Sequence, residues 1–91
     1  MDYKQKLEYQ SNYWYNDGLK KAQIRDLSGA IVSLKRSLQF NRENITARNL
    51  LGLVYYGRGE VAEALVEWII SKNSRASENI ASYYISKVQD N

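Results

Sequence analysis

The chain has 91 residues and a net charge of +3, from 13 basic and 10 acidic side chains. It contains no cysteine, histidine or proline, which excludes a disulfide framework, histidine-based metal sites and His-dependent catalytic triads. The basic excess is small and occurs in pairs such as Lys20-Lys21 and Lys35-Arg36. Such pairs are typical of solvated helix faces, so we expect no nucleic-acid partner. The length fits one small domain or a piece of a larger array.

The first predicted helix covers about Asp2–Ile24. Asp2 and Gln5 have the spacing of a capping box. Aromatic residues occur on several faces of this helix, so some are expected to be exposed; they are Tyr3, Tyr9, Tyr13, Trp14 and Tyr15. After a turn at Gln23–Asp26, a clean apolar stripe predicts a second helix over about Leu27–Phe40.

Polar residues 41–44 end the second helix, and Asn44 is a good N-cap for a third helix over about Ile45–Tyr56. The third helix is apolar nearly all round, which predicts burial on more than one side. Glycines at 57 and 59 predict a tight turn before a fourth helix, about Glu60–Ser71. Beyond a polar connection at Lys72–Ser77, Ser77 is expected to cap a fifth helix that ends near Gln89.

A spacing of 34 residues relates the first two helices to the next two. It separates Gly18 from Gly52, Ala30 from Ala64, and Leu34 from Trp68. Small residues at 52 and 64 predict the closest approach of the third and fourth helices. The large side chains expected to fill the space around that crossing are Leu51, Tyr55, Val61 and Trp68.

On this spacing the chain resembles the tetratricopeptide repeat family. The resemblance implies an all-α fold in a single domain over residues 1–91: two tetratricopeptide-like αα-hairpins at about 11–44 and 45–78, and a capping or half-repeat helix at about 78–90. It also implies a right-handed α-solenoid. Polar Asp17 and Lys21 occupy places that are usually apolar in the family, and Arg48 replaces a tryptophan.

The sequence shows no plausible catalytic set, so we expect no enzyme activity, no cofactor and no metal. The resemblance further implies a binding module. In this family the first helix of each pair lines a concave groove for a peptide or protein segment. The positions carried over one by one are Asn12, Tyr15, Asn16, Leu19, Asn49, Leu50, Leu53 and Tyr56. Asparagine amides there would hydrogen-bond a peptide backbone, and tyrosines would add apolar area. For Leu50 and Leu53, packing in the core is an equal alternative.

A structural role is the alternative to peptide binding. The last helix has an apolar stripe that only one neighbour can cover, which predicts a homodimer through Tyr83, Tyr84, Ile85 and Val88, through the aromatic first helix, or through both. The chain is otherwise expected to be the N-terminal fragment of a longer repeat scaffold. The first ten residues lack the apolar region of a secretion signal, and no apolar run is long enough to cross a bilayer, so we expect a cytoplasmic protein. Richness in Lys, Asn, Tyr and Ile indicates an AT-rich bacterial genome.

Overall fold

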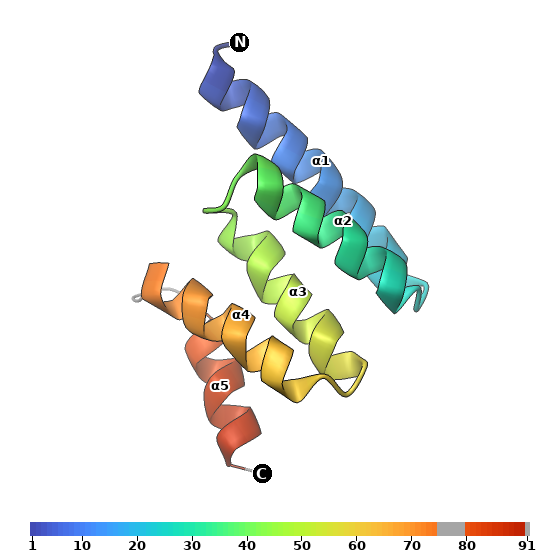
Figure 1. The fold of residues 1–91 in the computed structure, drawn as a ribbon, viewed down its shortest axis with the longest axis vertical. Coiled ribbons are helices and arrows are strands. Elements are labelled where there is room, and N and C mark those ends of the chain that lie inside the picture. The colour runs from blue at the N-terminus through green and yellow to red at the C-terminus, as the bar shows by residue number, and fades with distance from the viewer. Residues whose placement is uncertain (75–79, 91) are drawn as a thin grey trace.

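The computed structural model describes residues 1–74 and 80–90. Within these residues it is all-helical, with five helices and no strand, as the sequence predicts (Figure 1). The helices are α1 (Tyr3–Gln23), α2 (Leu27–Phe40), α3 (Ile45–Gly57), α4 (Val61–Ser74) and α5 (Ala81–Gln89). Four predicted helix ends differ from the observed ones by a single residue. The predicted end of the fourth helix at Ser71 is wrong, because α4 continues to Ser74. The predicted cap at Ser77 lies outside the described residues.

Side-chain caps fix where the first three helices begin. The Asp2 carboxylate accepts the backbone N–H of Gln5 at 2.7 Å, and the Gln5 side-chain oxygen accepts the N–H of Asp2 at 3.0 Å, which confirms the predicted capping box. Asn44 caps α3 as predicted, since its side-chain oxygen accepts the N–H of Ala47 at 3.1 Å. Asp26 caps α2 in the same way.

The helices pack in chain order, each against the next, and α1 also contacts α3. In Figure 1, α2 lies in front of α1 and α4 lies in front of α5, with α3 between the two groups. The first turns of α1 extend past the end of α2, and the two termini lie at opposite ends of the long axis. This arrangement of adjacent helix pairs is compatible with a helical repeat fold.

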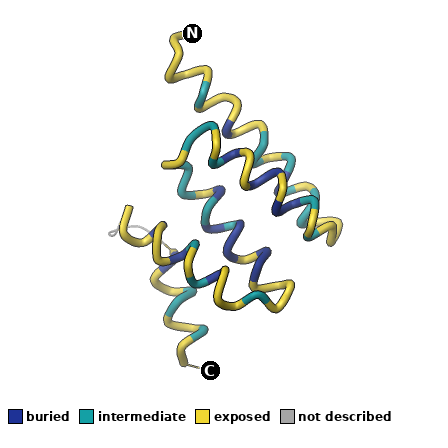
Figure 2. Tube along the Cα trace, in the orientation of Figure 1, coloured by how far each residue is buried: buried dark blue, intermediate teal, exposed yellow. Residues whose placement is uncertain are grey.

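Helix α3 forms the centre of the core. It has more buried residues than any other described helix (Figure 2), which confirms that it is covered on more than one side. Trp68 from α4 is 1% exposed and packs in this core as predicted, and Trp14 is half-buried. Val61, in contrast, is 37% exposed. It does not fill the crossing because it begins α4, at the edge of the contact with α3.

Each helix pair contains one glycine that lets a large side chain approach the backbone. A Cβ atom added to Gly18 would lie 2.7 Å from Leu34 Cγ, and one added to Gly52 would lie 2.6 Å from Trp68 Cδ1. Contacts this short are not found for real Cβ atoms, so both positions need glycine. The glycines and their partners are each 34 residues apart, so the repeat spacing reproduces the same contact twice. The side chain nearest to Gly52 is thus the indole of Trp68.

Candidate functional site

A hollow of about 400 Å³ lies between α1, α3 and α5. Its lining is mostly apolar and consists of Tyr15, Ile45, Thr46, Asn49, Leu50, Leu53, Ile80 and Tyr84. Four of the eight predicted groove residues are therefore together in one place, one from the first helix pair and three from the second. Leu50 and Leu53 share one side of α3 because they are three residues apart. The region has the size and the mixed apolar and polar lining of a binding site.

The remaining predicted groove residues lie outside this hollow. Tyr56 lines a smaller neighbouring space with Leu53, and its ring centroid is 6.1 Å from that of Trp68. Asn16 is exposed and Leu19 is half-buried on α1, and neither lines the hollow. Asn12 lines a different pocket. The eight positions therefore do not form one continuous row.

Asn49 lies deeper than the prediction of a groove-facing amide implied. The residue is only 9% exposed, and its backbone carbonyl accepts the indole N–H of Trp68 at 3.2 Å. This bond draws α4 against α3 at the level of Asn49. Leu50 is half-buried and packs on the core, whereas Leu53 is 39% exposed. Of these three, Leu53 offers a ligand the most surface.

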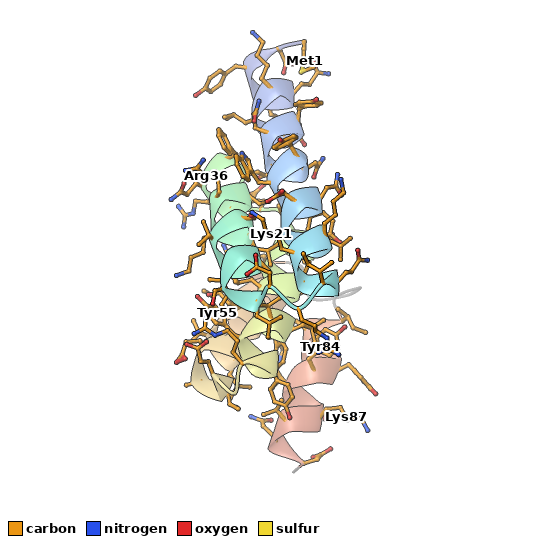
Figure 3. The ribbon with its side chains drawn as sticks, turned by 90° about the vertical axis from the view of Figure 1, so that its right-hand side faces the viewer. Met1, Lys21, Arg36, Tyr55, Tyr84 and Lys87 are labelled. Carbon is orange, nitrogen blue, oxygen red and sulfur yellow. The ribbon has the colours of Figure 1, made fainter. Side chains whose placement is uncertain are left out.

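The residues predicted for self-association have different surroundings. Tyr84, Ile85 and Val88 are half-buried against the core, and the ring of Tyr84 lies 5.2 Å from that of Trp68. These three side chains of α5 therefore pack against the α3–α4 pair. Tyr83 is exposed, with the Lys87 ammonium 5.7 Å from its ring centre, on the helix where Figure 3 labels Tyr84 and Lys87.

Sequence reasoning missed Ile80, which lines the hollow and is half exposed. A signal for it was present, because Ile80 precedes Tyr84 by four residues and extends the same apolar stripe by one turn. The contributions of Ile45 and Thr46 at the start of α3 were also missed. Their place in the hollow depends on how α1 crosses α3, which no local pattern reveals.

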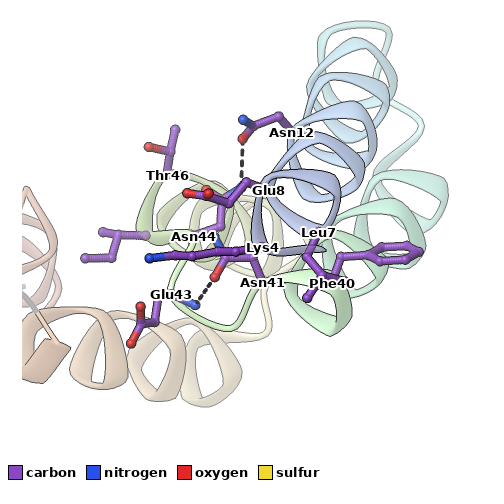
Figure 4. Close-up of a pocket in the computed structure, with 10 residues that line it drawn as sticks. Lys4, Leu7, Glu8, Asn12, Phe40, Asn41, Glu43, Asn44 and Thr46 are labelled. Carbon is purple, nitrogen blue, oxygen red and sulfur yellow. Dashed lines mark hydrogen bonds between the residues drawn. The ribbon is translucent and has the colours of Figure 1, made fainter. Parts of the chain in front are cut away.

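A second pocket, of about 420 Å³, lies between the first half of α1 and the connection from α2 to α3 (Figure 4). Its lining is mainly polar and includes Lys4, Glu8, Asn12, Asn41, Glu43 and Asn44. The Asn44 amide donates to the Asn12 side-chain oxygen at 3.3 Å and to Ser11 Oγ at 2.9 Å. The side-chain oxygen of Asn12 therefore already accepts a hydrogen bond within the chain, and the pocket offers little apolar area to a protein segment.

A polar cluster joins α1 and α2 at the side chain labelled Lys21 in Figure 3. Lys21 Nζ lies 2.8 Å from the Asp17 carboxylate and donates to Ser33 Oγ at 3.1 Å. The hydrogen bonds from Lys21 and then Ser33 hold the pKa of Asp17 below its usual value. Ser33 is buried and donates its hydroxyl proton to Asp17. It is placed to hold two helices together rather than to attack a substrate.

No group of three or more metal-ligating acidic side chains occurs in residues 1–74 and 80–90. In the same residues, no helix combines the length and the hydropathy that crossing a bilayer requires.

No protein-family model matches this chain. Over 45 residues, half of the chain, it is 42% identical to the BBSome complex member bbs-4 of Caenorhabditis elegans. The match spans about a tenth of that protein's length. The cytoplasmic location, the bacterial origin and the repeat boundaries stay predictions.

Proposed function

We propose that this chain is a tetratricopeptide-like interaction module that binds an apolar or aromatic segment of another protein in the hollow between α1, α3 and α5. The observation that carries the proposal is the meeting of Tyr15, Leu50, Leu53 and Tyr84 around one space of about 400 Å³. The similarity to a member of a protein complex supports the same class of function.

The exposure of the lining explains why a ligand would gain energy there. Leu53 on α3 is 39% exposed, and Ile80, which directly precedes α5, is 49% exposed at the same hollow. Single exposed apolar residues are common, but apolar residues that converge from several helices on a concave surface are typical of a binding site. The phenol of Tyr15 adds apolar area with one polar atom for orientation.

A selection experiment tests the proposal. Peptides selected from a random display library on the immobilised chain are labelled, and their affinities are measured by fluorescence anisotropy. Leu53→Asp places a charge in the hollow and should weaken the best peptides about tenfold or more. Val32→Asp is the matched control, because Val32 is exposed on α2 and does not line the hollow.

Circular dichroism of both variants shows whether each is folded. A library that yields no binder, or binders that Leu53→Asp and Val32→Asp affect equally, would contradict a binding site in this hollow.

The second candidate function is assembly through the last helix. The exposed side chains of Tyr83 and Ile80 favour assembly. Light scattering after gel filtration should give the mass of a dimer at about 100 μM, well above a micromolar dissociation constant. Tyr83→Glu should return the chain to a monomer. A monomer mass for the unaltered chain at that concentration would contradict self-association.

A further inference from the structure

A second groove lies between α2 and α4, with α3 at its base. It encloses about 480 Å³ and is lined by Lys35, Leu38, Gln39, Arg42, Arg48, Leu51 and Glu67. At 3.6 residues per turn, Arg48 and Leu51 project from the side of α3 opposite Leu50 and Leu53. This groove and the hollow described above are therefore separate surfaces.

The charges of the groove are unbalanced. Arg48 Nη1 lies 2.8 Å from the Glu67 carboxylate, and both side chains are largely buried, so these two charges neutralise each other. Lys35 and Arg42 are exposed, and neither takes part in an ion pair with another described residue. Helix α2 contains no acidic residue. The groove thus presents two uncompensated cations, one turn before and about one turn after Leu38 in the chain.

The groove adjoins a second space, and each of the two has an apolar residue in its lining. A neighbouring space of about 380 Å³ shares Arg42 and Arg48 with it and adds Glu43, Ile70 and Ser74. Ile70 is 41% exposed on α4, and Leu38 is half-buried on α2. A length of chain with both acidic and apolar side chains fits these features better than a compact small molecule.

We propose that the groove between α2 and α4 binds an acidic segment of a partner protein. Carboxylates of the segment pair with Lys35 and Arg42, and an apolar side chain between them contacts Leu38 and Ile70. Charge complementarity of this kind raises the association rate and selects the partner. A nucleic acid fits less well, because none of the lining residues has an aromatic ring on which bases could stack.

The test uses labelled synthetic probes and fluorescence anisotropy. The probes are a short peptide of alternating Glu and Leu blocks, the same peptide with Gln for Glu, the same peptide with Ser for Leu, and an oligo(dT) strand. The Glu/Leu peptide should bind the intact chain more tightly than each of the other three by about tenfold. Its affinity should also fall as salt is raised, because the cations are exposed.

Charge reversal locates the binding surface. The double variant Lys35→Glu/Arg42→Glu should weaken the Glu/Leu peptide about tenfold or more. Lys6→Glu/Lys20→Glu changes the net charge equally at exposed positions on α1 and should have little effect. Leu53→Asp should leave this affinity unchanged, so failure of the hollow and failure of the groove are distinguishable.

Several results would overturn the proposal. These are the absence of binding by the Glu/Leu peptide at about 1 mM, equal weakening by the two double variants, equal affinity for the Gln/Leu peptide, and tighter binding of oligo(dT). The last result would assign the groove to nucleic acid instead.

Discussion

The two helix pairs share one central contact and differ in what surrounds it. In α1–α2, Gly18 receives Leu34, and in α3–α4, Gly52 receives Trp68. Three positions beside this contact hold Asp17, Lys21 and Ser33 in the first pair. The residues 34 positions further on are Leu51, Tyr55 and Glu67.

Because different residues surround the glycine contact, the two helix pairs have different sources of stability. Leu51 and Tyr55 are almost fully buried, and burying side chains of this size contributes about 1.5–3 kcal/mol each. The polar cluster of the first pair is satisfied by hydrogen bonds, which contribute about 0.5–1.5 kcal/mol each. The apolar version occurs where α3 is covered from several sides, and the polar version occurs between α1 and α2.

Truncation of the two large side chains tests this difference most strongly. Trp68→Ala should lower the free energy of unfolding by about 3–5 kcal/mol, because it empties a buried space and leaves the Asn49 carbonyl without its indole donor. Leu34→Ala should cost about 2–4 kcal/mol, because the side chain is smaller. Urea denaturation followed by circular dichroism measures both values.

If Trp68→Ala is too unstable to measure, Trp68→Phe provides the smaller step in the same direction. A cost for Leu34→Ala that exceeds the cost for Trp68→Ala would show that the first pair, not the second, contains the dominant core.

Replacing each glycine by alanine should affect the two helix pairs differently, because the side chains that contact the two glycines differ in rigidity. At Gly52 the new methyl meets the planar indole, and at Gly18 it meets the flexible Leu34 side chain. We expect Gly52→Ala to destabilise by about 1–3 kcal/mol. Gly18→Ala should cost less, because alanine favours a helix by about 1 kcal/mol over glycine and Leu34 can rotate away. Thermal melts that rank the two variants in the opposite order would contradict this explanation.

The sequence predicted the helices and the matched positions of Gly18 and Gly52 well, because capping and the 34-residue spacing are local or strictly periodic signals. It predicted the hollow only in part. Tyr15, Leu50 and Leu53 do meet there, but the third wall is α5, and its crossing against α3 depends on the packing of Tyr84 on Trp68.

The polar cluster of Asp17, Lys21 and Ser33 could likewise not be predicted from the sequence. Asp17 and Lys21 stand out in the sequence as departures from the family pattern, but their partner Ser33 is on another helix. No spacing rule connects the three residues. Only the packing of α1 against α2 shows that they satisfy one another.

A second polar contact in the first pair has a distinctive mutational signature. Ser11 Oγ donates to the Ser37 carbonyl at 2.8 Å, Ser37 Oγ donates to the Ser11 carbonyl at 2.7 Å, and both residues are fully buried. Ser11→Ala or Ser37→Ala alone should cost about 1 kcal/mol. The double variant should cost less than the sum, because the 3.0 Å contact between the two hydroxyl oxygens is lost in either single variant and is therefore counted twice in the sum. Strict additivity in urea denaturation would show that the two hydroxyls act independently.

The smallest expected effect concerns the charge of Asp17. Its side chain is 34% exposed, so the ion pair with Lys21 is partly screened and should contribute about 1 kcal/mol or less. The hydrogen bonds from Lys21 and Ser33 lower the pKa of Asp17 in the folded chain, so the folded state releases this proton more readily than the unfolded state. The resulting stabilisation is fully present above the unfolded pKa of about 4 and is lost as the pH falls through the lower folded pKa.

Asp17→Asn should therefore be less stable than the unaltered chain near neutral pH, and the difference should shrink as the pH falls below about 4. Urea midpoints measured across this range give the curve. Glu63→Gln removes an exposed carboxylate from α4 and provides the matched control for the loss of one negative charge. A difference for Asp17→Asn that stays constant down to about pH 3 would mean that the side chain contributes through its shape and neutral hydrogen bonds. The polar cluster would then stabilise the first helix pair without using its charge.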